Sequence, residues 1–153
     1  MKDMTKKAWK VVYLDHGQAK SVTVHEPTAV VGYELGKWSL PKIGKLFVFD
    51  RARAAWQFYC DLAVGTSLRP FYAIYEGRAM NLAPAPKRIL GLSSPEEEGS
   101  YAELISKFWN EGPSAVGALT FPFVFPGTAV CDRFLPLADV TEKLRWKYPI
   151  VSL

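Results

Sequence analysis

The sequence predicts an α+β fold, as a single β-rich globular domain over residues 1–153 whose strands are mostly antiparallel. Short segments rich in β-branched and aromatic residues alternate with turns that contain Gly, Pro or Asp, which is typical of such strands. Two other stretches, about 50–63 and 100–110, repeat apolar residues at helical spacing. The length fits one domain, and 49% hydrophobic and 14% aromatic residues supply a core.

An N-terminal β-hairpin is expected first. Its arms are residues 9–14 and 19–24, and the turn between them runs from Asp15 to Gln18 and contains Gly17. Pro27 then interrupts the pairing. Residues 28–34 follow, either as another short strand or as an extended entry to a loop.

The central part of the chain predicts a loop, a strand and a helix in direct succession. Residues 36–44 indicate a loop because they contain two glycines and a proline, and residues 46–49 are an apolar run of strand length. Asp50 suits a helix N-cap. The helix after it ends by Gly65 and carries an apolar stripe formed by Ala52, Ala55, Trp56, Tyr59, Leu62 and Ala63.

The second half predicts further strands around a second helix. Residues 68–76 indicate a strand, and residues 77–98, with their glycines, prolines and acidic run, indicate an irregular loop. Ser100 and Glu103 match a capping box, so the second helix is expected over about 100–110, before Gly112 and Pro113.

Residues 115–137 are apolar and expected to be extended. Residues 121–128 are expected to contain an edge or bulged strand, because proline cannot donate to a sheet. A last strand at 129–137 and a short helix at 141–147 complete the prediction.

Charge is unevenly distributed along the chain. Residues 1–60 carry ten Lys or Arg against five Asp or Glu, a net +5, and residues 61–153 carry nine against ten, a net −1. This asymmetry favours an anionic partner for the N-terminal half, with a solvated, solubilising surface as the alternative.

The sequence predicts no catalytic residues, no metal site and no cofactor. His16, His25, Cys60 and Cys131 are the only histidines and cysteines, and their spacing is not that of a zinc site. The two cysteines are expected to be buried thiols rather than a disulfide. The sequence shows neither a signal peptide nor an apolar run long enough for a bilayer, so a cytoplasmic protein that does not enter membranes is expected.

The candidate ligand-binding site is a basic and aromatic stretch of thirteen residues. Ammonium groups and aromatic rings in close sequence can hold an anionic, planar ligand by charge and stacking. In the alternative interpretation the two rings anchor the core and the lysines face solvent. The five residues are Tyr33, Lys37, Trp38, Lys42 and Lys45.

The order of turn and strand residues resembles small uncharacterised proteins of bacteriophages and prophages. The resemblance covers about half of the chain. It implies an architecture rather than a function, because its motifs form strands, caps and turns. Those motifs are Tyr33-x-x-Gly36-Lys37, Pro41-x-x-Gly44-x-Leu46-Phe47-Val48-Phe49-Asp50 with Ala55 and Phe58, and Pro126-Gly127-Thr128-Ala129-Val130 with Leu135 and Leu137.

A second similarity is to compact ADP-ribosyltransferase-type folds, which pair a strand with a helix of this type and finish near a Pro-Gly-Thr turn. That family implies an early Arg or His and a catalytic Glu on a late strand. Here the first arginine is Arg51, His25 is the only substitute for the early group, and residues 115–137 contain no glutamate. The similarity therefore implies a fold rather than transferase activity.

The leading hypothesis is a non-enzymatic, phage-type accessory protein that binds an anionic partner: a host protein, a nucleic acid or a nucleotide signal. One alternative is a small enzyme, either ADP-ribosyltransferase-like or cysteine-dependent. Another is a virion or oligomeric structural component that uses residues 121–125 as an apolar edge. The oligomeric state is left open.

Overall fold

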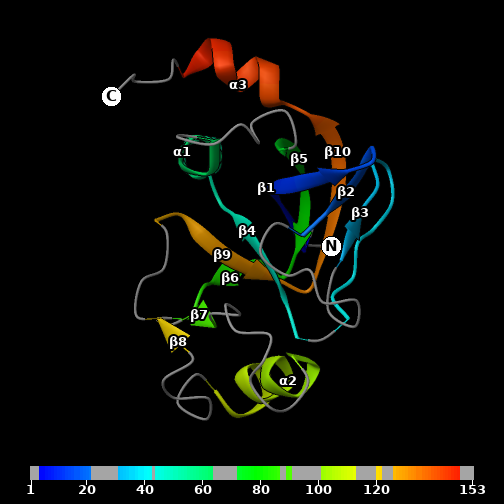
Figure 1. Cartoon of the computed structure of the whole chain (residues 1–153), viewed down its shortest axis with the longest axis vertical. Helices are drawn as coiled ribbons and strands as arrows, with labels where there is room; N and C mark the ends of the chain where they lie inside the picture. The colour runs from blue at the N-terminus through cyan, green and yellow to red at the C-terminus, as the bar shows by residue number, and fades with distance from the viewer. Residues whose placement is uncertain are drawn as a thin grey trace.

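The protein is described by a computed structural model over residues 4–21, 31–42, 44–63, 72–86, 89–90, 101–112, 120–121 and 126–148. It confirms the α+β class, with an antiparallel, β-rich sheet and three helices in the described part of the chain (Figure 1). The elements are β1 (Thr5–Asp15), β2 (Gln18–Lys20), β3 (Gly32–Tyr33), β4 (Leu46–Phe49), α1 (Ala52–Ala63), β5 (Tyr72–Met80), β6 (Ala83–Pro84), β7 (Ile89–Leu90), α2 (Tyr101–Glu111), β8 (Thr120–Phe121), β9 (Thr128–Cys131), β10 (Arg133–Asp139) and α3 (Thr141–Lys147).

Strand β1 is the centre of the main sheet. One edge pairs with β5 from Thr5 opposite Met80 to Tyr13 opposite Tyr72, and the other edge pairs with β2 and β4. The main strand order is β10-β5-β1-β4-β9-β6, and β3 joins through β2. The predicted hairpin is confirmed: His16 (φ 53°) and Gly17 (φ 82°) make its turn, with the two positive φ angles of a type I′ turn.

The sheet has a separate core on each face because side chains alternate along β1. Val11 packs with α1 and α3, whereas Ala8 and Val12 pack on the opposite face, where the sheet curls over itself. In Figure 1, α1 and α3 lie together at the upper end of the molecule and α2 lies at the lower end.

The curled face is closed into a ring by the segment after β3. Ser39 N donates to Phe134 O (2.7 Å), Phe134 N donates back to Ser39 O (3.1 Å), and Gly36 N donates to Pro136 O (2.7 Å). Neighbouring strands pair in the order β3-β2-β1-β5-β10. The bonds from Ser39, just after β3, to β10 therefore close these strands into a ring. The predicted loop at 36–44 is therefore held against the outer edge of β10.

Two predictions about strands were wrong. Residues 77–80, expected in an irregular loop over 77–98, continue β5, and β6 and β7 follow within the same range. The single strand expected at 129–137 is two strands separated at Asp132, because β9 pairs with β4 and β6 whereas β10 pairs with β5.

The helices lie where their periodicity predicted them. In α1 the first hydrogen bond runs from Ala55 N to Arg51 O (3.3 Å), so the helix begins slightly later than 50, and the Asp50 carboxylate accepts from Arg51 Nε (3.0 Å). Helix α3 matches the prediction for 141–147. Among the described residues, the longest helix has 12 residues, too few to cross a lipid bilayer.

Several predicted features lie outside the described residues. They are the hairpin arm beyond Ser21, the strand starts at 28–30 and 68–71, the acidic run at 96–98, Ser100 of the capping box, and the extended segments at 115–119 and 122–125.

Gly77 provides a test of the sheet packing. It lies opposite Pro136, at the register shift in β10, and a Cβ there would come within 1.9 Å of Leu135 O. Since that oxygen belongs to backbone, Gly77→Ala should lower the free energy of unfolding by about 3 kcal/mol. Chemical denaturation measures the change.

Gly32→Ala is the matched control. Gly32 also lies in a strand, but among the described residues the nearest atom to an added Cβ would be Ala19 O, at an ordinary contact distance of 3.9 Å. This substitution should change the stability by less than about 1 kcal/mol. Equal losses in the two variants would contradict the close approach of β5 and β10 at Gly77.

Candidate functional site

The candidate surface is the segment 34–45, which follows β3 and crosses the edge of β10. It begins with a turn in which Lys37 N donates to Glu34 O (3.1 Å) and Gly36 adopts φ 84°, the positive value that a type II turn requires at its third residue. Ser39 Oγ also donates to Gly32 O (3.0 Å). The segment is thus fixed to both β3 and β10.

Alternation along this segment sends Ser39 inward and its two neighbours outward. Ser39 is 6% exposed, whereas Trp38 is 38% and Leu40 53% exposed. Leu35 and Leu137 are also exposed, and the Gly36–Pro136 hydrogen bond brings their two segments together. We call these four side chains, Leu35, Trp38, Leu40 and Leu137, the apolar rim.

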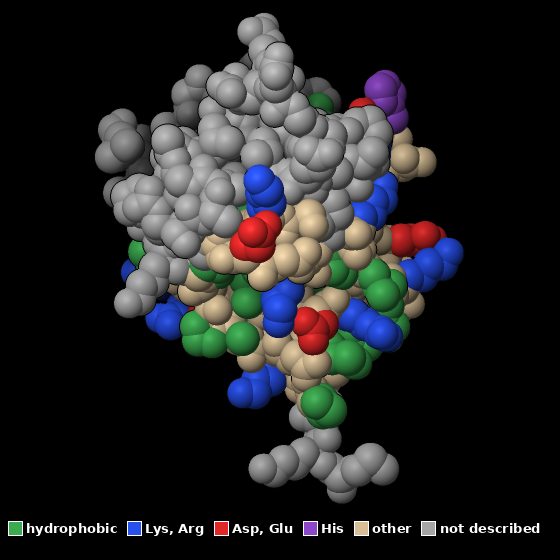
Figure 2. Space-filling view, turned by 90° about the horizontal axis from the view of Figure 1, so that it is seen from below, with side chains coloured by type: hydrophobic (Ala, Val, Ile, Leu, Met, Phe, Trp, Pro, Cys, Tyr) green, Lys and Arg blue, Asp and Glu red, His purple; other side chains and the backbone are tan. Residues whose placement is uncertain are grey.

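The three predicted lysines lie at the surface, and carboxylates lie close to the ammonium groups of Lys37 and Lys45. Lys37 Nζ is 3.2 Å from Glu34 Oε2, and Lys45 Nζ is 3.2 Å from Asp132 Oδ1. Lys42 is exposed. Figure 2 shows the same mixture over one face, where Lys and Arg are interspersed with Asp and Glu. The segment therefore offers cations without forming a strongly positive field.

The Asp132 carboxylate is held on two sides. It accepts a hydrogen bond from Asn81 Nδ2 (2.7 Å) and pairs with Lys45, and these contacts lower the pKa of Asp132. Lys45 thereby reaches the connection between β9 and β10, where Asp132 lies.

The predicted stacking role of Tyr33 is wrong. Its side chain is only 4% exposed and lies inside the ring, where its aromatic ring meets that of Phe134 at 6.3 Å between centroids. Burial raises the pKa of its hydroxyl far above the usual value. A group sealed in this way packs the core and cannot stack on an external ligand.

Beneath Tyr33 lies a half-buried lysine that sequence reasoning did not single out. Lys10 Nζ donates to Phe47 O (2.6 Å) and lies 5.4 Å from the Tyr33 ring centroid. Burial lowers the pKa of Lys10 to about 8. Nearby Cys131 is fully buried, and burial raises the pKa of its thiol to about 11. Cys60 and Cys131 are both free thiols; Cys131 is buried as predicted, whereas Cys60 is only partly buried.

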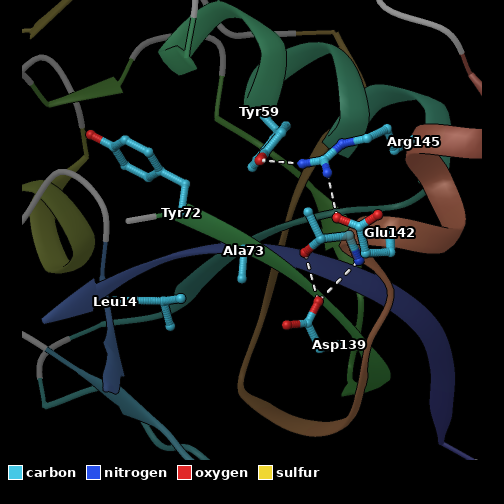
Figure 3. A pocket seen from close by; sticks show the side chains of 8 residues that line it. Leu14, Tyr59, Tyr72, Ala73, Asp139, Glu142 and Arg145 are labelled. Carbon is cyan, nitrogen blue, oxygen red and sulfur yellow. Dashed lines mark hydrogen bonds and ion pairs between the residues drawn. The ribbon is translucent and has the colours of Figure 1, made fainter. Parts of the chain in front are cut away.

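A pocket of about 650 Å³ lies elsewhere, between the sheet and helices α1 and α3 (Figure 3). Sequence reasoning missed it because its residues come from β1, α1, β5, the end of β10 and α3. The available signals were Tyr59 on the predicted helical stripe and the polar residues around the predicted start of α3. Its lining includes Leu14, Tyr59, Tyr72, Asp139, Thr141 and Arg145.

No protein-family model, curated protein or solved structure matches this chain. Of the residues that the transferase similarity involves, Arg51 lies at the start of α1 beside Asp50, and His25 lies outside the described residues. Within the described ranges, no three His, Cys, Asp or Glu side chains are placed to hold a metal ion.

The buried ammonium predicts an unusual dependence of stability on alkaline pH. The pKa of Lys10 is about 8 in the folded protein, compared with the ordinary value of 10.5 expected in the unfolded chain. Between these two pH values the unfolded chain binds more protons than the folded protein, so the free energy of unfolding rises with pH. Cys131, at about 11 rather than 9, acts in the opposite direction from pH 9 upward. Stability should rise by roughly 0.5–1 kcal/mol from pH 8 to 9 and then level off.

Urea denaturation of the protein and of Lys10→Met checks this dependence. The variant keeps an unbranched side chain of similar length but has no ammonium to titrate, so its stability should fall above pH 9 without the preceding rise. Parallel curves for the two proteins between pH 8 and 9 would show that Lys10 is not the group responsible.

Proposed function

We propose that the protein acts without catalysis, by binding an anionic, base-bearing partner through the segment 34–45. The ligand class is a nucleotide or a single-stranded nucleic acid. The observation that carries the proposal is the position of Trp38, an aromatic ring left exposed on a segment that hydrogen bonds hold on both sides. Such a ring offers a stacking surface without a large cost of ordering on binding.

The lysines around this ring supply the charge for the phosphates. Lys37 and Lys42 are exposed within four positions of Trp38, and the carboxylate of Glu34 that pairs with Lys37 is itself exposed. Ion pairs between exposed groups are worth at most about 1 kcal/mol. A phosphate can therefore replace the carboxylate of Glu34 at small cost.

A phage-type accessory role fits this kind of binding. In such a role the protein would sequester a nucleotide, a nucleic acid or a host protein in the infected cell. An acidic host protein is the macromolecular variant of the same proposal, because the apolar rim and the paired lysines have the mixed composition of protein interfaces.

A second candidate function is that of an oligomeric structural component. The observation that favours it is the apolar rim, since Leu35, Leu40 and Leu137 are each about half exposed and flank Trp38. Neighbouring exposed apolar side chains commonly mark contact surfaces. The segment 121–125, first considered for this role, lies mainly outside the described residues.

Trp38→Ala tests the binding function. Stacking of one base contributes about 1–3 kcal/mol, so the affinity for a fluorescently labelled thymidine oligonucleotide should fall by roughly 5- to 150-fold in anisotropy titrations. Trp146→Ala is the matched control, because Trp146 is 85% exposed but belongs to α3. Circular dichroism verifies that both variants are folded.

ATP titrated in the same way distinguishes a mononucleotide from a strand. Binding should weaken steeply as salt is raised, because the lysine–phosphate contacts release counterions. Failure of the unaltered protein to bind both probes, or equal affinities in the two tryptophan variants, would remove this proposal.

Leu40→Glu tests the oligomeric alternative. If the apolar rim joins copies of the chain, light scattering should give a mass that rises with concentration, and the substitution should return it to that of one chain, because a charge in an apolar contact must be desolvated. Lys42→Glu, two positions away on the same segment, is the control. A mass of one chain at every concentration would exclude this function.

A further inference from the structure

The pocket between α1, α3 and the sheet holds polar groups of both charges around an apolar wall. Figure 3 shows Arg145 and Tyr59 along one side of it and Asp139 at another, with Glu142 between Arg145 and Asp139. Leu14, Tyr72 and Ala73 supply the rest of the lining that matters for a ligand. A volume of about 650 Å³ lies within the usual range for small-molecule sites.

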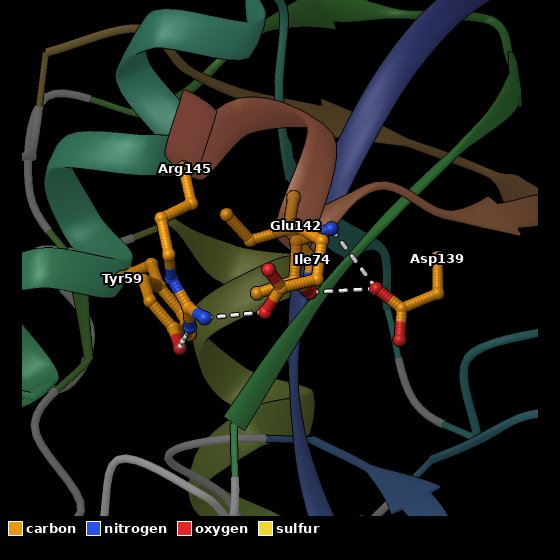
Figure 4. Close-up of polar contacts among 6 residues, drawn as sticks. Tyr59, Ile74, Asp139, Glu142 and Arg145 are labelled. Carbon is orange, nitrogen blue, oxygen red and sulfur yellow. Dashed lines mark hydrogen bonds and ion pairs between the residues drawn. The ribbon is translucent and has the colours of Figure 1, made fainter. Parts of the chain in front are cut away.

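One end of the pocket is cationic and donates hydrogen bonds. The Arg145 guanidinium pairs with Glu142 and reaches the Tyr59 hydroxyl at 3.4 Å (Figure 4). Its other N–H groups have no partner among the described residues. Tyr59 is 1% exposed and stacks on Trp56, so its ring is held in place, and its hydroxyl accepts from Arg145 and helps to position the guanidinium at the pocket.

The other end is anionic. Asp139 Oδ1 accepts from Thr141 N (3.0 Å) and from Thr141 Oγ1 (2.6 Å). Thr141 Oγ1 in turn accepts from Ile74 N (2.8 Å), which ties the carboxylate to β5. The second oxygen of Asp139 has no hydrogen-bond partner among the described residues. A positioned carboxylate with one open oxygen is an acceptor for an ammonium or N–H group.

The charges decide what kind of ligand fits. Arg145 contributes one positive charge against the negative charges of Asp139 and Glu142, so a phosphate or other compact anion is disfavoured there, and so is a cation that leaves Arg145 uncovered. A molecule with one group of each sign satisfies both ends.

We propose that this pocket binds a small zwitterion with an aromatic or apolar body, of the amino-acid type. Its carboxylate lies against Arg145, its ammonium against the open oxygen of Asp139, and its body against Tyr72. The site is separate from the segment 34–45, and the proposal does not depend on the function assigned to that segment.

Glu142 gives the proposal a distinctive consequence. Its carboxylate is the present partner of Arg145, and its side chain is 70% exposed, so the pair is weak and competes with the ligand carboxylate. Removing the charge of Glu142 should therefore improve binding, whereas removing the charge of Arg145 or Asp139 should impair it.

A matched ligand series tests the proposal on the unaltered protein. L-tyrosine carries both charged groups, tyramine only the ammonium, and 3-(4-hydroxyphenyl)propionate only the carboxylate. Because a charged hydrogen bond contributes about 1.5–3 kcal/mol, tyrosine should bind at least tenfold more tightly than the other two in NMR titrations at pH 7. The shifted amide signals should come from β5, α1 and α3.

Variants then assign each contact. Arg145→Gln should make the affinities for tyrosine and tyramine equal. Asp139→Asn should make the affinities for tyrosine and the propionate equal. Glu142→Gln should increase the affinity for tyrosine. Lys143→Gln, an exposed change on the same helix, should alter none of these. Equal affinities for the three ligands, no binding of tyrosine, or shifts confined to other elements would overturn the proposal; the ligand series decides even if Asp139→Asn fails to fold.

Discussion

The pair of hydrogen bonds between Ser39 and Phe134 is the constraint on which the rest of the molecule depends. Without it, β10 would be an open edge and the side chains beneath it would meet water. With it, Phe134 and Tyr33 become fully or almost fully buried, and the rings pack edge to face. The same bonds leave Trp38 and Leu40 on the outside, because neighbours of an inward residue in extended backbone must point outward. The core and the exposed surface therefore have one cause.

Strand β10 links the two candidate sites. At Phe134 and Pro136 its backbone holds the segment 34–45, and at its end Asp139 lines the pocket through its bonds to Thr141. Between them lies the register shift near Gly77, where the two strand backbones approach too closely for a side chain at position 77. The position of this irregularity sets which part of β10 serves the ring and which part reaches the helices.

Local signals in the sequence were sufficient for the hairpin and the helices but not for the long-range arrangement. Asp15 to Gln18 specify their turn through glycine chemistry, and the stripe from Ala52 to Ala63 specifies its helix through spacing. Gly77 was expected to begin a loop but lies inside β5. The sequence alone cannot distinguish a glycine that permits close contact between strands from one that ends a strand. Tyr33 could not be assigned a direction, since β3 has two residues and Gly32 offers no side chain from which an alternating pattern could be inferred. The pocket could not be predicted from the sequence because its residues come from five elements that meet only in the folded protein.

The charge asymmetry of the chain illustrates the same limit in electrostatic terms. The N-terminal half carries a formal +5, yet folding brings carboxylates from the other half onto its cations: Glu76 lies 3.6 Å from Lys7, and Asp132 lies 3.2 Å from Lys45. Lys10 is half-buried, and the partial loss of its hydration lowers its pKa. Charge that is uneven along the sequence is thus interspersed in space. Recognition at the segment 34–45 must accordingly come from contact with Trp38 and local exchange of ion-pair partners, because a field of mixed sign attracts an anion only at short range.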